Sequence, residues 1–182
     1  MPRIKKEEKE IINNLSQKEL SKIVLKLASK DKLVYEYLYV NYLNKEDGEK
    51  DLFNKTLDNI SLCFAKKYKA YAPEQKATKM LSASIKELND FIKSSKNKNM
   101  EAELLIVILE EAFLHPEASL GTCFTGFDNK IAQILKRLIT LVTKKMHEDY
   151  LIEYQDKINK YLKIIHKQSG FNDYVYELPD EI

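Results

Sequence analysis

The chain has 182 residues, 44% of them hydrophobic and 32% charged, which is enough to build one domain around its own core without support from disulfides or metals. Its content of only four glycines and four prolines disfavours an all-β fold with many tight turns. The formal net charge of +2 is too small to indicate a nucleic-acid or membrane partner for the molecule as a whole.

The cysteine content and the length of the apolar runs indicate in which cellular compartment the protein is expected. The two cysteines, Cys63 and Cys123, cannot form a disulfide framework, and reduced thiols are typical of cytoplasmic proteins. Residues 1–8 contain no apolar leader, and no run of about 18 apolar residues occurs. We therefore expect a cytoplasmic protein with neither a secretion signal nor a membrane partner.

The N-terminal region predicts a charged arm followed by a helix. Residues 1–14 are mostly charged and are expected to fray. Ser16 and Glu19 have the spacing of a capping box, which marks a helix start. Apolar residues then recur at i, i+3, i+4 and i+7, as expected for one face of a helix over residues 16–28; they are Leu20, Ile23, Val24 and Leu27.

The next two segments are also expected to be helical. Residues 33–43 are rich in tyrosine and branched side chains, which suits a strand, but strict alternation fails, so a helix with Asp31 as its N-cap fits better. Gly48 is expected in the turn beyond. A narrow apolar stripe then predicts a third helix from Asp51 to about Ala70.

The middle of the chain predicts the helix around which the fold is organised. Pro73 is placed to begin a fourth helix, and the polar run 93–99 is expected to be the longest interior linker. The six apolar residues from Leu104 to Leu109 could form a buried strand or a helix covered on most sides. Asn99 as N-cap and a stop at His115-Pro116 favour the helix.

The C-terminal third predicts a loop, a long interrupted helix and a tail. Residues 116–127 form the loop, and Asp128 is the expected N-cap. The apolar stripes before and after Lys144–Asp149 are out of phase, which predicts a bend or break there. Gly170 is expected to cap the final helix, with an irregular or extended tail beyond it.

Together these patterns predict an all-α fold. We expect a helical bundle or short antiparallel helical array of about six or seven helices, with a long, kinked C-terminal segment. The domain should span residues 15–170, between a charged arm (1–14) and an acidic, aromatic tail (171–182).

Several segments resemble a family of small, uncharacterised, all-helical bacterial proteins. Leu15–Leu20, Leu25–Leu27 and Val34–Tyr37 are similar to the start of these proteins. They also carry a basic central helix and a later acidic and apolar helix, similar to Ile85–Lys93 and Glu101–Phe113 here. The resemblance implies an all-helical fold and a bacterial origin, with no activity or catalytic residues to transfer.

Residue patterns for chemistry are sparse. Glu111 and His115 share a helix face, and His147 precedes two carboxylates, so a carboxylate and histidine metal site is conceivable. The Glu-x-x-His pattern of helical di-iron proteins is absent, and a histidine ending a helix is the simpler interpretation of His115. There is no Gly-rich phosphate loop, serine elbow or Cys-x-x-Cys. We therefore expect no cofactor and no enzymatic activity.

Two charged segments are candidate interaction surfaces. In the lysine patch, five lysines and one glutamate alternate with tyrosines; its candidate residues are Lys66, Lys67, Tyr68, Lys69, Tyr71, Lys76 and Lys79. Such a patch could bind phosphates while bases stack on the rings, but with hardly any arginine a solvated corner is favoured.

The tail is acidic but too apolar to be a purely solvating end, although chain ends are often disordered. We expect it to dock in extended form on a helical surface of its own molecule or of a second copy, guided by the lysine patch. The expected docking residues are Phe171, Tyr174, Tyr176 and Leu178.

The sequence thus favours a non-enzymatic helical protein that interacts with or scaffolds another protein. The partner is not named by any motif, and a homodimer is one arrangement left open. The alternatives are nucleic-acid or phosphate binding through Lys66–Lys79, and a helical metal-binding enzyme built on Glu111 and His115.

Overall fold

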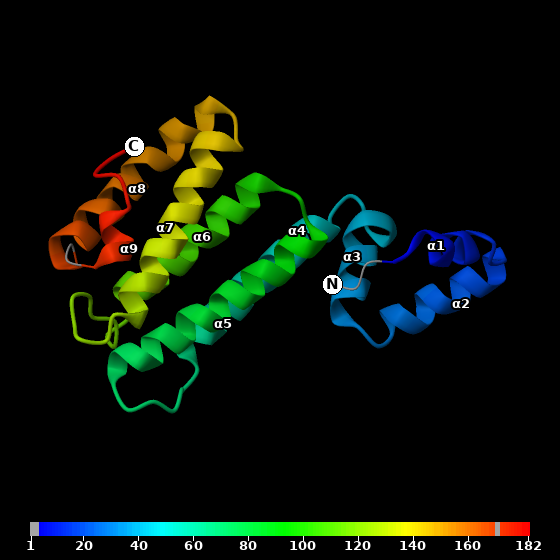
Figure 1. Cartoon of the computed structure of the whole chain (residues 1–182), viewed down its shortest axis with the longest axis horizontal. Helices are drawn as coiled ribbons and strands as arrows, with labels where there is room; N and C mark the ends of the chain where they lie inside the picture. Colours follow the sequence, from blue (N-terminus) through cyan, green and yellow to red (C-terminus); the bar gives the residue numbers. More distant parts are fainter. Residues whose placement is uncertain (1–3, 170–171) are drawn as a thin grey trace.

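The computed structural model describes residues 4–169 and 172–182, and this part of the chain is helical without any strand, which confirms the all-α prediction (Figure 1). In chain order the helices are α1 (Lys6–Asn13), α2 (Gln17–Ala28), α3 (Lys32–Leu38), the π-helix η1 (Tyr39–Leu43), α4 (Gly48–Ala65), α5 (Pro73–Ser94), α6 (Lys98–Leu114), α7 (Gly126–Lys144), α8 (Glu148–Ser169) and α9 (Asp173–Tyr176). None of the described helices combines the length and apolarity that a membrane crossing requires.

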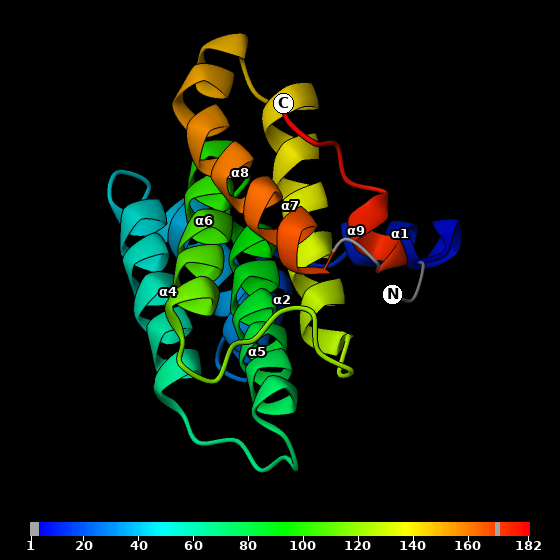
Figure 2. The same cartoon turned by 90° about the vertical axis from the view of Figure 1, so that its left-hand side faces the viewer.

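The body of the molecule is an array of packed helices from α4 to α8. Helix α5 packs against α4, α6 and α7, and α8 covers α7 on the far side (Figures 1 and 2). The run Leu104–Leu109 of α6 is buried except for the half-buried Val107, so α6 is covered on most sides as predicted. Burying such a continuous apolar run requires neighbours on several faces, and α4, α5 and α7 provide them.

The expected linker between α5 and α6 is much shorter than predicted. Helix α5 continues to Ser94, and only residues 95–97 separate it from α6. The N-cap is Asn97 rather than Asn99, because its side chain accepts the backbone N–H groups of Asn99 and Met100. Its amide also donates to Glu49 at 3.1 Å, which holds this position from α4. The longer interior connections are residues 66–72 and 115–125.

The start of α4 was also misplaced. Gly48 is the first residue of the helix and does not lie in a preceding turn. A Cβ atom there would stand 3.2 Å from the Tyr39 carbonyl oxygen of the π-helix, so the close approach of the two segments favours glycine. At its other end α4 stops at Ala65, before the predicted end near Ala70, because Lys66 is extended.

The C-terminal helices break where the phase slip predicted. Helix α7 ends at Lys144 and α8 begins at Glu148. Asp128, however, is not the N-cap: α7 begins at Gly126, two residues earlier. The buried Asp128 carboxylate instead accepts the Gly121 N–H at 2.9 Å and the Ser169 hydroxyl, so it joins the preceding loop to the end of α8. Gly170, the expected cap, lies outside the described residues.

Both chain ends contain a helix that the sequence analysis did not predict. Residues expected to fray form α1, at whose start the Lys5 N–H donates to the Glu8 carboxylate at 2.7 Å. The tail, expected to be irregular or extended, contains the short helix α9, which is capped by the Asn172 side chain. It packs on α7 and α8. Beyond α9 the Ile182 carbonyl accepts the side-chain amide of Gln155 at 2.6 Å.

Candidate interaction surface

Exposed apolar side chains concentrate at the N-terminal end of the molecule. Of the seventeen exposed large apolar and tyrosine side chains in residues 4–169 and 172–182, eleven lie between residues 4 and 43. No residue of α1 or α2 is buried. Along the described chain, Val40 is the first apolar residue to reach the core. The two N-terminal helices therefore present apolar surface without contributing to the interior.

The densest part of this surface is one face of α2, which we call the α2 stripe: Leu20, Ile23, Val24 and Leu27. Three of these side chains, Ile23, Val24 and Leu27, are 42–50% exposed, and Leu20 is half-buried. Helix α2 lies at one end of the long molecular axis, away from the α4–α8 body, and contacts α3 (Figure 1). The stripe is accordingly accessible to another molecule.

Helix α2 is ordered locally at its first turn. The predicted capping box is present: Ser16 Oγ accepts the Glu19 N–H at 3.3 Å, and the Glu19 carboxylate accepts the Ser16 N–H at 2.9 Å. The Ser16 hydroxyl also donates to the Glu19 carboxylate at 2.6 Å, and this bond, together with the one from the Ser16 N–H, lowers the pKa of Glu19. The helix start is therefore fixed by its own sequence and needs no tertiary contact.

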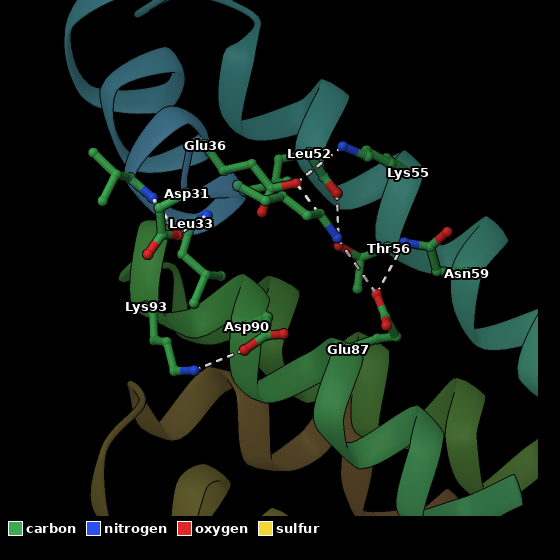
Figure 3. Close-up of polar contacts among 12 residues, drawn as sticks. Asp31, Leu33, Glu36, Leu52, Lys55, Thr56, Asn59, Glu87, Asp90 and Lys93 are labelled. Carbon is green, nitrogen blue, oxygen red and sulfur yellow. Dashed lines mark hydrogen bonds and ion pairs between the residues drawn. The ribbon is translucent and has the colours of Figure 1, made fainter. Parts of the chain in front are cut away.

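Polar contacts fix α3, which carries the α1–α2 arm, to the body (Figure 3). Glu36 of α3 is buried, and its carboxylate lies 2.9 Å from the Lys55 ammonium of α4. Glu87 of α5 accepts the Asn59 amide of α4 at 3.0 Å and lies 3.9 Å from the Lys32 ammonium of α3. Three helices thus meet in one polar junction at the base of the α1–α2 arm.

The lysine patch lies where the end of α4, the start of α5 and the segment after α6 meet. Two of its five lysines are bound within the molecule: Lys76 pairs with Glu117 at 3.0 Å, and Lys79 donates to the Lys69 carbonyl at 2.6 Å. Lys66 and Lys67 are exposed beside a shallow cavity of about 410 Å³. The charge predicted for this patch is therefore partly neutralised by the fold.

The candidate metal ligands lie in two parts of the fold: Glu111 and His115 at the end of α6, and His147 between α7 and α8. Glu111 accepts the Ser61 hydroxyl at 3.4 Å, and the His115 ring lies 6.2 Å from that of Phe64. His147 lies in the turn between α7 and α8, exposed and 3.1 Å from Asp149. Within residues 4–169 and 172–182, no three His, Cys, Asp or Glu side chains form a group that could hold a metal ion.

The tail packs on its own molecule, but of the three expected docking residues that the structure describes only Leu178 is buried there. Val175 and Leu178 are buried, whereas Tyr174 and Tyr176 are exposed, and Phe171 lies outside the described residues. The Glu177 carboxylate of the tail pairs with Lys136 of α7 at 2.7 Å, and this lysine is outside the lysine patch that was expected to guide the tail.

A groove that the sequence analysis missed lies between α6, α8 and the 115–125 loop. It has a volume of about 760 Å³. Its wall includes Phe113 stacked on Tyr161, with ring centroids 4.9 Å apart, and Leu114 is exposed at its rim. Burial raises the pKa of Tyr161 to about 12. No local pattern could have revealed this groove, because segments far apart in the sequence build it.

No family model, curated protein or solved structure matches the chain. The α2 stripe is visible in the sequence as one apolar helix face, and that pattern ordinarily indicates a face turned toward the core. An exposed stripe could have been distinguished from a core-facing one by the charged segment before α2, because that segment supplies little apolar surface to cover the stripe.

Proposed function

We propose that this protein is a non-enzymatic interaction module that binds a protein partner through the α2 stripe. The observation that carries the proposal is a twelve-residue amphipathic helix without a single buried residue. Isolated helices of this length are marginal in water, and most helical stability in proteins comes from packing the apolar face. A helix of this kind gains stability when a partner covers it.

The setting of the stripe supports the same function. Contiguous apolar surface on a folded protein marks an interaction site more often than scattered single residues do. Helix α3 at the base of the arm packs against α5, and its Glu36 pairs with Lys55 of α4, so the stripe is attached to the body through these contacts. An amphipathic helix that lays its apolar face into a groove is a recurrent mode of protein recognition.

Phosphate or nucleic-acid binding through the lysine patch has less support. Lys76 is paired with Glu117, and Lys79 is bound to a backbone carbonyl. A ligand phosphate would have to compete with these contacts, and the remaining exposed lysines lack the arginine forks that favour bidentate phosphate binding.

Site-specific photo-crosslinking in the native host tests the proposal. A photoreactive amino acid replaces Ile23 in the full chain, and a matched chain carries it at Leu62, which is 63% exposed on α4. We expect a discrete protein adduct from position 23 and none from position 62. Equal labelling from both positions, or none from position 23, would contradict a docking role for the stripe. The mass of the adduct identifies the class of partner.

A further inference from the structure

We propose that the partner of the α2 stripe is a second copy of this chain, and that the two α2 helices pair antiparallel about a two-fold axis. This inference rests on the proposed function, because it names the partner of the same surface. It depends on the order of residues along the stripe, on the charges beside it and on the position of the arm.

The stripe is self-complementary when its direction is reversed. Its four positions are symmetric about the midpoint between Ile23 and Val24. In an antiparallel pair centred there, Leu20 faces Leu27 of the second copy, and Ile23 faces Val24 of the second copy. A two-fold interface requires this property, since each contact between two different residues must occur twice.

The charges beside the stripe favour the same arrangement. Glu19 and Lys26 are seven residues apart, so they lie along the same edge of the stripe, two turns from one another. Antiparallel pairing places Glu19 beside Lys26 of the second copy, and the symmetric contact forms along the same edge at the other end of the interface. A parallel pair would lose both contacts. In a parallel pair the edge that carries Glu19 and Lys26 faces the opposite edge of the second α2 helix, which carries neither residue.

The position of the arm makes this pairing accessible. Helix α2 joins the body through its C-terminal end, by way of α3 (Figure 1). In an antiparallel pair these ends point in opposite directions, so the two bodies lie at opposite ends of the interface. Lys18 and Lys22 lie on the face of α2 opposite the stripe, where they stay hydrated.

The experiment measures the mass of the purified full chain by sedimentation velocity from about 1 µM to about 500 µM, a range that covers micromolar and weaker association. The wild-type mass should rise with concentration from 21.3 kDa toward twice that value. Ile23→Asp should weaken the association about tenfold or more, because it places a charge in the interface. The matched control is Leu25→Asp on the other side of the same helix, where the side chain is 71% exposed; it should associate like the wild type.

A second pair of variants tests the antiparallel register. Lys26→Glu sets two carboxylates beside each other and should weaken association several-fold, whereas Lys22→Glu, the same change on the opposite face, should not. Adding Glu19→Gln to Lys26→Glu should recover part of the loss, since glutamine still completes the capping box. Melting curves of each variant check that the body remains folded.

The outcomes separate this inference from the proposed function. A chain that stays monomeric at about 500 µM, or a dimer that Ile23→Asp leaves unchanged, overturns self-pairing. If position 23 then crosslinks to a different protein, the proposed function stands with another partner. Monomers that bind anionic lipid vesicles through α2 would assign the stripe to a membrane surface and overturn both.

Discussion

Replacement of Arg137 by methionine tests a hydrogen-bonded ion pair with a buried carboxylate, which joins three helices of the body. The guanidinium of Arg137, on α7, contacts one carboxylate oxygen of Glu101, on α6, with Nη2 at 2.8 Å and Nε at 3.2 Å. Its Nη1 donates to Asn89 of α5 at 2.9 Å. The other Glu101 oxygen accepts Lys98 at 2.7 Å. Methionine keeps much of the side-chain volume and removes every one of the Arg137 bonds.

The size of the effect follows from burial. Removing one partner of a buried ion pair costs about 3–5 kcal/mol, since the other charge is left without compensation. The Glu101 side chain is 6% exposed, but Arg137 is 30% exposed and Lys98 remains, so we expect a loss of about 2–3 kcal/mol. For a chain of this length each kcal/mol lowers the melting temperature by about 2–4 °C, which gives a fall of about 4–12 °C.

The pH dependence provides an independent check. Burial raises the pKa of Glu101, but the hydrogen bonds from Lys98 and Arg137 outweigh it, so its pKa lies below the ordinary value. A lowered pKa in the folded state stabilises the protein above the unfolded pKa, and this stabilisation is lost as the pH falls through the folded pKa. Without Arg137, less of the pKa increase caused by burial of Glu101 is offset. The difference in unfolding free energy between wild type and variant should therefore be largest near pH 7 and shrink below about pH 4.

Urea and thermal unfolding followed by circular dichroism at several pH values measure both effects. Lys136→Met is the control: its ion pair with Glu177 is exposed on both sides and should contribute little to stability. An Arg137→Met protein that unfolds like Lys136→Met at pH 7, or a difference that grows toward acid pH, would refute the reasoning.

Three further predictions address the core, the tail and a buried phenol. Ile106→Asp should unfold or aggregate the protein, because it places an unpaired charge in the core; an unchanged far-UV spectrum and melting curve would contradict the burial of α6. Leu178→Ala should cost about 2–4 kcal/mol, and the exposed Tyr176→Ala less than about 0.5 kcal/mol; equal urea midpoints would contradict tail packing. In a spectroscopic titration of the folded protein, Tyr161 should ionise near pH 12, as its pKa of about 12 indicates; its contribution to stability should be lost as the pH rises from about 10 to about 12.

Features of the fold with local causes could be read from the sequence. The Ser16–Glu19 capping box and the Asp31 cap form within a few residues of each other, and Pro73 begins α5. The break after Lys144 follows from the phase of two apolar stripes, because one straight helix cannot direct both toward the same core. In each case the pattern and its physical cause lie in the same segment.

Features decided by distant partners were misplaced. Asn97 and Asn99 are equally suitable caps by type, and contact with Glu49 of α4 accompanies the choice of Asn97. Asp128 has the residue type of an N-cap, but the structure uses its carboxylate to join Gly121 and Ser169. The groove beside Phe113 has no sequence signature at all, since its walls meet only after the helices pack.

The α2 stripe combines a feature that the sequence predicts with one that depends on the rest of the fold. Its periodicity fixes an amphipathic helix, but only the fold reveals that the body leaves the face uncovered. Full burial of an aliphatic side chain contributes about 1.5–3 kcal/mol, and the stripe residues are about half covered already, so each has roughly 1 kcal/mol left to gain.

A two-fold interface between the α2 stripes covers eight such side chains, which is a small apolar contact for a protein–protein interface. Ile11 and Ile12 of α1, which are also exposed, are the nearest source of further apolar area along the arm. Because both the order of α2 and the pairing depend on covering the same face, we expect α2 to become more ordered as the chain associates, and the body to stay folded whether it associates or not.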